Sequence, residues 1–199
     1  MAETKTDELK KIRDEVWNLK ESPLYLYRKE HKYYPVLGEG SHSAKIMFIG
    51  EAPGKNEAET GRPFCGAAGR ILDELLASIN LKRHDVYVTN IVKDRPPENR
   101  DPSPSEIALY APFLGRQIDV IEPQVIATLG RFSMQFILEK FKLPEATQSI
   151  SALHGKLLAA KASYGTISIL PFYHPAVALY NGSSKKTLLE DFQKLKEFV

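Results

Sequence analysis

Four short apolar runs alternate with helical patterns, and this alternation constrains the fold more than any other feature of the sequence. The runs are AKIMFIG at 44–50, DVYVTNIV at 85–92, QVIATLG at 124–130 and TISILPFYHP at 166–175. Apolar residues at helical spacing lie at 6–20, 67–79, 103–121, 131–141 and 183–198. Strands that are apolar on both faces and alternate with helices are typical of parallel sheets covered on both sides. The sequence therefore predicts an α/β fold with a parallel four-stranded sheet between helical layers.

Length and composition favour a single domain spanning 1–199, because no linker or repeat interrupts the 199 residues and 43% of them are hydrophobic. Cys65 is the one cysteine, which excludes an intramolecular disulfide and favours a reducing, cytoplasmic location. The first twenty residues are polar and carry acids as well as bases, unlike a signal or transit peptide. No uncharged apolar run approaches the roughly 18 residues of a membrane span, so we expect no membrane partner.

Ligands of open parallel sheets bind at the carboxyl ends of the strands, which here read GEAPG, TN, LG and YHP. The first end continues into a glycine-rich loop, GEAPGKNEAETGRPFCGAAGR at 50–70, whose glycines allow main-chain N–H groups to approach a ligand. The loop contains neither GxxxxGK[ST] nor GxGxxG, so it does not match a phosphate-binding loop. Phe64 in this loop needs a stacked ligand or a neighbouring loop to cover it.

Four motifs in order carry a resemblance to a known family: GEAPG, GRPF-x-G-x-AG, TN-x-VK-x-RPP-x-NRDP and HPA-x-AL. From about Leu19 to the C-terminus the chain resembles the uracil-DNA glycosylase superfamily, and specifically its family 4 members. The resemblance implies a three-layer αβα sandwich around a four-stranded parallel sheet. It also implies removal of uracil from DNA by hydrolysis of the glycosidic bond, the first step of base excision repair.

One departure from family 4 concerns a cofactor. Its members typically hold a [4Fe-4S] cluster through four cysteines, whose positions correspond here to Leu19, Ser22, Asp94 and Tyr110. Thiolates are what hold such clusters, so we expect no cofactor and no metal site. We expect Leu19, Tyr110 and neighbouring aromatic side chains to fill this corner, and Cys65 to be a structural or incidental thiol.

Three residues are expected to handle the uracil base once it has been flipped out of the DNA stack. Phe64 would stack on the base. The amide of Asn90 offers a donor and an acceptor for the O4 and N3–H edge of uracil. His174 would donate to O2, where negative charge develops as the bond breaks. An isolated histidine at a strand end is usually structural, but the neighbouring motifs favour a catalytic role for His174.

The GEAPG segment would supply the residues that position the attacking water. In the best-known family of the superfamily an aspartate that positions the water stands two places after the first glycine, where this chain has Ala52. The remaining carboxylates, Glu51 and Glu57, could each orient a water or balance the cationic sugar. Glu51 fits better because it is nearest the strand end, whereas Glu57 could equally be a solvent-facing loop residue. The main-chain N–H groups around Ala52 and Gly54 could add to the O2 site.

Cations near the same edge are expected to contact DNA phosphates, which would make affinity fall with salt. The candidates are Lys93, Arg95, Arg100, Arg131 and Lys185. Leu179 or Tyr180 would fill the emptied base stack as a wedge, although both residues could simply pack the last helix.

The main expectation is a monomer that releases uracil from single- or double-stranded DNA by hydrolysing its glycosidic bond. Two alternatives remain open. The chain could be a weak or inactive module that binds uracil-containing or single-stranded DNA, but it retains both His174 and Asn90. It could also accept other deaminated bases, hypoxanthine or xanthine. Covalent trapping of uracil is not favoured, because a trapping relative in the superfamily carries a basic insertion with a histidine that KDRPPENRDPSPS at 93–105 lacks.

Overall fold

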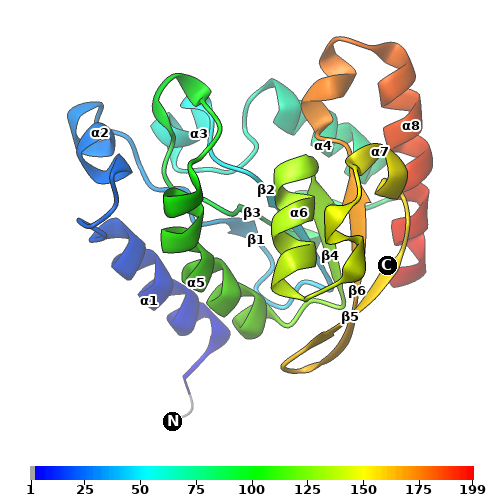
Figure 1. The fold of residues 1–199 in the computed structure, drawn as a ribbon, viewed down its shortest axis with the longest axis horizontal. Helices are drawn as coiled ribbons and strands as arrows, with labels where there is room; N and C mark the ends of the chain where they lie inside the picture. The colour runs from blue at the N-terminus through cyan, green and yellow to red at the C-terminus, as the bar shows by residue number, and fades with distance from the viewer. Residues whose placement is uncertain (1–2) are drawn as a thin grey trace.

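A six-stranded sheet lies at the centre of the computed structural model, which describes residues 3–199 (Figure 1). The strands are β1 (Glu39–Gly40), β2 (Ile46–Gly50), β3 (Tyr87–Asn90), β4 (Val125–Leu129), β5 (Leu158–Ala162) and β6 (Gly165–Phe172). Their order across the sheet is β1-β3-β2-β4-β6-β5. The four inner strands are parallel, whereas the edge strands β1 and β5 pair antiparallel with their neighbours.

Helices cover both faces of the sheet, which makes three layers (Figure 1). The α-helices are α1 (Lys5–Trp17), α2 (Leu24–Glu30), α3 (Lys55–Thr60), α4 (Ala67–Ala77), α5 (Pro104–Ile121), α6 (Arg131–Lys140), α7 (Ile150–Leu153) and α8 (Gly182–Phe192). The 3₁₀ turns are η1 (Arg83–Asp85), η2 (Pro97–Asn99), η3 (Pro144–Thr147), η4 (Pro175–Leu179) and η5 (Gln193–Phe198). Within residues 3–199, no helix combines the length and the apolar character needed to cross a bilayer.

The alternation of side chains along the strands divides the core into two parts. In β2, Met47 and Ile49 pack with α1, α5 and α6, while Ile46 and Phe48 pack with α4 and α8. Successive residues of a strand point to opposite faces, so a strand buried on both faces is apolar throughout. This is the pattern from which the sequence predicted a covered parallel sheet.

The predicted αβα fold and its four parallel strands are confirmed. The sheet edges, the short helices α2, α3 and α7, and two helix ends differ from expectation. The sheet is extended by β1 and β5, which sequence patterns did not indicate. The first helix ends at Trp17 instead of residue 20, and the last α-helix ends at Phe192 before η5. Helix α5 begins as predicted from its serine: the Ser103 side chain accepts from Glu106 N, and the Glu106 carboxylate accepts from Ser103 N.

Candidate active site

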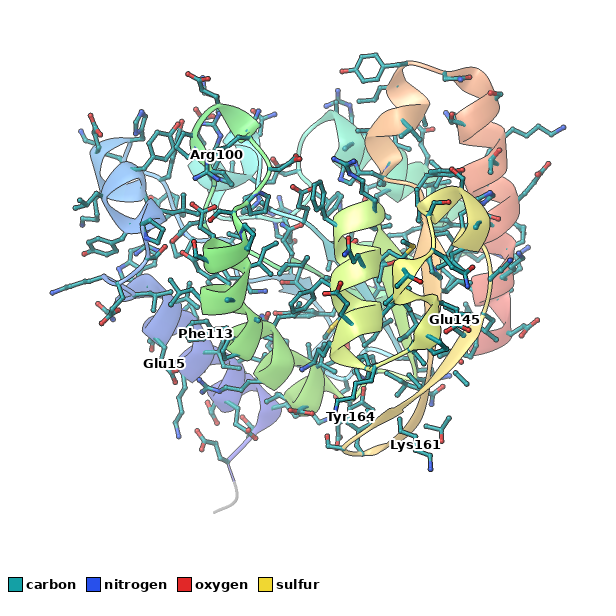
Figure 2. All side chains as sticks on the ribbon, in the orientation of Figure 1. Glu15, Arg100, Phe113, Glu145, Lys161 and Tyr164 are labelled. Carbon is teal, nitrogen blue, oxygen red and sulfur yellow. The ribbon has the colours of Figure 1, made fainter. Side chains whose placement is uncertain are left out.

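The ends of the parallel strands bring the predicted site residues to one end of the molecule. Asn90 ends β3, Glu51 follows β2 and His174 follows β6. This end carries α3, η2 and η4, at the top of Figure 1, and Arg100 marks it in Figure 2. A small open hollow of about 140 Å³ lies here, lined by Glu51, Ala52, Pro53, Gly54, Pro96, Asn99, Arg100, Asp101 and His174. The hollow is the mouth of the candidate site.

Asn90 and Phe64 converge behind this mouth. A Cβ atom built on Gly50 would overlap Asn90 Oδ1 and lie 2.7 Å from Phe64 Cζ, so only glycine leaves room for both side chains. Phe64 is 6% exposed and Asn90 is 2% exposed. Among the described residues, no protein group hydrogen-bonds the side-chain amide of Asn90. The amide therefore keeps its hydrogen-bonding groups unused beside the Phe64 ring, and neither residue lines the open hollow itself.

The backbone of Phe64 is held in an uncommon conformation. Its φ is 49°, in the left-handed region that side-chain-bearing residues seldom adopt. The Phe64 carbonyl accepts a hydrogen bond from Arg83 Nη2 and lies so close to Gly69 of α4 that a Cβ there would collide with it. Local strain of this kind is typical of functional sites, where surrounding contacts enforce it.

His174 is half-buried, with its ring 5.7 Å from the Phe64 ring. Ala176 N donates to His174 Nδ1 at 3.2 Å, so the neutral imidazole carries its proton on Nε2. Burial lowers the pKa of His174 below its ordinary value, and the negative charge of Glu57 only partly opposes this effect. The ring is therefore neutral at pH 7, with a fixed Nε2–H donor.

Glu51 is part of the lining of the mouth and makes no hydrogen bond through its side chain within residues 3–199. Burial raises the pKa of Glu51 to about 7; the nearby Asp101 carboxylate adds to the shift and Arg131 opposes it. A carboxyl group that titrates near the working pH can accept a proton from water. Perturbed groups of this kind cluster at functional sites.

Glu57 has a structural role in this loop. Its Oε1 accepts from the backbone N–H groups of Cys65 and Gly66, each at 2.9 Å. These bonds tie α3 to the turn after Phe64, so Glu57 positions the Phe64 segment. Of the two carboxylates left open by the sequence, Glu51 is the unpaired one.

The prediction that Lys93 contacts DNA was wrong. Lys93 is fully buried, and its Nζ donates to Thr89 Oγ1, Asn90 O and Gln117 Oε1. Burial lowers the pKa of this amine well below its ordinary value. The chain turns inward after β3, so Lys93 supports the end of that strand from within and cannot reach a phosphate.

The other predicted cations lie at or near the surface and differ in availability. Arg131 is the most open, with its side chain 70% exposed and a long 3.5 Å contact to Asp101. Arg100 forms a two-pronged pair with Glu106 at 2.6 and 2.8 Å, and Lys185 pairs with Glu74. Arg95 is half-buried and donates to two tyrosine hydroxyls and to Asn99.

The two candidate wedge residues lie at the end of η4. Tyr180 is 89% exposed and Leu179 is 42% exposed. Tyr180 is therefore too exposed to pack against the last helix, which was the alternative to a wedge role for this residue.

The corner at which the resemblance to family 4 would place cluster ligands is filled by a buried polar network. Asp94 accepts two hydrogen bonds from Arg28 Nη1, at 3.0 and 3.1 Å, and one from the Tyr110 hydroxyl, which also contacts Ser22 Oγ at 2.8 Å. Arg28 also donates to the carbonyls of Val16 and Trp17. The expected packing of Leu19 and Tyr110 agrees with the structure, because Tyr110 is fully buried in the core and Leu19 packs against it. The ion pair of Arg28 with Asp94 and the contact of Ser22 with Tyr110 were not expected.

This corner does not fit an iron–sulfur cluster, because a carboxylate, two hydroxyls and a guanidinium occupy it and no thiolate is present. Sequence reasoning missed Arg28. The available signal was its position four residues after buried Leu24, on the inner side of α2. Within residues 3–199, no group of His, Cys, Asp or Glu side chains could hold a metal ion.

Comparisons with known proteins identify the family to which the chain belongs. The family model of the uracil DNA glycosylase superfamily matches residues 37–196. A type-4 uracil-DNA glycosylase of Sulfurisphaera tokodaii is 46% identical over 97% of this chain and 86% of its own length. Similar enzymes of Archaeoglobus fulgidus and Thermotoga maritima are 44% and 40% identical, over 86% and 89% of this chain and 84% and 87% of their own lengths. On the sequence match and the fold, this chain belongs to the uracil-DNA glycosylase superfamily.

Proposed function

We propose that this protein excises uracil from DNA by hydrolysing the bond between uracil N1 and the deoxyribose C1′. The observation that carries the proposal is the convergence of an unpaired amide, an aromatic ring and a neutral imidazole donor behind one mouth: Asn90, Phe64 and His174. The relatives named type-4 uracil-DNA glycosylase support the same reaction.

Recognition rests on Phe64 and Asn90. A base flipped out of the stack enters beside the Phe64 ring, where stacking contributes about 1 to 3 kcal/mol. The Asn90 amide accepts from N3–H and donates to O4 of uracil. Cytosine presents the opposite pattern at this edge, so mispaired buried groups disfavour it.

Cleavage rests on His174 and Glu51. As the N1–C1′ bond breaks, its electron pair leaves with uracil, and the Nε2–H of His174 stabilises the charge that develops on O2. Ionised Glu51 orients a water molecule, whose oxygen attacks C1′ while the carboxylate accepts its proton. The main-chain N–H groups near Ala52 and Gly54 lie at the same mouth and add donors for O2.

DNA binding is assigned to the exposed cations and to η4. Arg131 is the most available phosphate contact, with Arg95, Arg100 and Lys185 at the surrounding surface. Tyr180 or Leu179 fills the gap left by the flipped base. We further propose that the chain acts as a single-domain monomer in the cytoplasm. We also propose that it holds no iron–sulfur cluster, because the buried network around Asp94 occupies the corner where the cluster would lie.

A glycosylase assay tests the proposal. Single-stranded uracil DNA, duplexes with U:G and U:A pairs, and hypoxanthine and xanthine substrates are incubated with the wild type and His174→Ala. Release of uracil by the wild type at a rate far above that of His174→Ala supports it, whereas uracil-DNA binding without release would identify an inactive binding module. Release of hypoxanthine or xanthine would identify broader specificity. Iron and sulfide analysis of the purified protein tests the cofactor assignment, and stoichiometric iron would refute it.

A further inference from the structure

A second surface, outside the mouth of the site, combines aromatic rings with unpaired cations. The segment after α1 reads YLYRKEHKYY at 25–34. With the end of α1 it surrounds a hollow of about 340 Å³, larger than the mouth of the candidate site. We call this the α2 surface and define it by Trp17, Lys29, Lys32, Tyr33 and Tyr34, all of which line the hollow.

The rings of the α2 surface are accessible and lie beside one another. Trp17 is 48% exposed and Tyr34 is 47% exposed, with ring centroids 6.0 Å apart. Tyr33 stacks on His31 at 5.3 Å with an interplanar angle of 20°. Large aromatic faces left open to solvent beside a hollow suit a flat ligand that can stack on them.

The charge of the α2 surface is positive. Lys29 and Lys32 are exposed and form no ion pair within residues 3–199, unlike Lys185 beside Glu74. Glu30 is the one acid in the 25–34 segment. Arg28 is neutralised by Asp94 below the surface, so the two lysines are the cations available to a partner.

Direct contacts join the α2 surface to the mouth of the site. Arg95 Nη1 donates to the Tyr33 hydroxyl at 2.9 Å, and Arg95 Nε donates to Asn99 Oδ1 at 2.8 Å. Asn99 lines the mouth beside Glu51. In Figure 1, α2 lies at the same end of the molecule as α3, η2 and η4. A strand whose base is in the site can therefore continue across the α2 surface.

We propose that the α2 surface binds single-stranded DNA flanking the target nucleotide, with bases stacked on Trp17 and Tyr34 and phosphates beside Lys29 and Lys32. The inference rests on the proposed function only in taking the bound strand to be the one that carries the target nucleotide. Exposed rings beside cations match the way that proteins bind single strands, whose bases present free faces. Duplex DNA keeps those faces in its own stack.

Trp17 is the one tryptophan in the chain, so intrinsic tryptophan emission reports on this surface. Uracil-free oligothymidylate should quench the emission. Inorganic polyphosphate, which carries the charge without bases, and a blunt duplex should not. Equal quenching by polyphosphate would refute stacking, and equal quenching by the duplex would refute the preference for single strands.

Variants separate the two parts of the surface. Tyr34→Ala should weaken oligothymidylate binding about tenfold, within the range for loss of one stacked base. The double variant Lys29→Ala/Lys32→Ala should lower the slope of log affinity against log salt by about 1.4, since each phosphate contact to a single strand contributes about 0.7. The matched control is Lys142→Ala/Lys161→Ala. Both of these lysines are exposed, have no ion pair within residues 3–199 and line another hollow, at the opposite end of the molecule, where Figure 2 labels Lys161.

Uracil excision is measured on the same variants. Single-turnover excision at saturating substrate should be unchanged, while KM should rise for long single strands and not for short ones. An unchanged KM together with an unchanged salt slope would overturn the α2 surface assignment even if excision is robust. Quenching by uracil-free DNA without any excision would support the surface and refute the proposed function instead.

Discussion

The substitution Asp94→Asn should destabilise the protein more than loss of any exposed ion pair. Asp94 is fully buried, and its partner Arg28 has a side chain only 4% exposed. The change removes the charge that balances the Arg28 guanidinium while leaving that guanidinium buried. Breaking a buried pair in this way costs about 3 to 5 kcal/mol, because the remaining charge is uncompensated.

This magnitude converts into a melting temperature. For a chain of this size, 1 kcal/mol shifts Tm by about 2 to 4 °C, so we expect a decrease of about 6 to 20 °C. The assay is thermal and urea unfolding at pH 7, followed by circular dichroism. Arg116→Gln is the matched control, since it breaks the Arg116–Glu15 pair, whose side chains are 44% and 48% exposed. Exposed pairs contribute about 0 to 1 kcal/mol.

A third variant tests the physical reason. Arg28→Met/Asp94→Leu removes both charges and should recover much of the stability, because apolar replacements of a buried pair are often neutral or stabilising. If Asp94→Asn lowers Tm no more than Arg116→Gln does, the network does not hold this corner and the reasoning fails. A double variant less stable than Asp94→Asn would show that the hydrogen bonds, and not the charge balance, are decisive.

Three further predictions concern the chemistry. His174→Ala should lower single-turnover uracil release about 10² to 10³-fold with little loss of uracil-DNA binding, because the imidazole acts on charge that appears in the transition state; equal losses would make it a docking residue. Asn90→Asp should narrow or invert the preference for uracil over cytosine, since a carboxylate offers acceptors only, and an unchanged ratio in a well-folded variant would remove Asn90 from recognition. The raised pKa of Glu51 means that its carboxylate forms as pH rises through about 7, so the single-turnover rate should rise over that range and Glu51→Gln should flatten the rise. Stability should change in the opposite direction to the rate. Because folding raises the pKa of Glu51, its contribution to the free energy of unfolding is lost as pH rises through about 7.

The sheet and much of the site could be predicted because local signals determine them. Runs such as IMFIG are apolar at every position, which only a strand covered on both faces requires. Once the strands are parallel, their ends must lie together, and this brings Glu51, Asn90 and His174 to one edge. These inferences need no knowledge of distant contacts.

The errors concern contacts between residues far apart in the sequence. Arg28 and Asp94 are separated by 66 positions, and neither residue alone signals a buried pair. Lys93 follows a strand end as a DNA-binding lysine could, yet its neighbours Thr89 and Gln117 provide acceptors inside the protein. Strand β5 is LAAKA, whose alanines lack strong strand propensity, and it forms because β6 offers an open edge.

The hydrogen bond from Ala176 N to His174 Nδ1 links the turn η4 to the His174 imidazole. The same bond caps the first turn of η4 and selects the tautomer of the imidazole. Because η4 also carries Leu179 and exposed Tyr180, a displacement of this turn that breaks the bond leaves the proton free to occupy either ring nitrogen. The position of this turn and the tautomer of the His174 imidazole are thus coupled through one hydrogen bond.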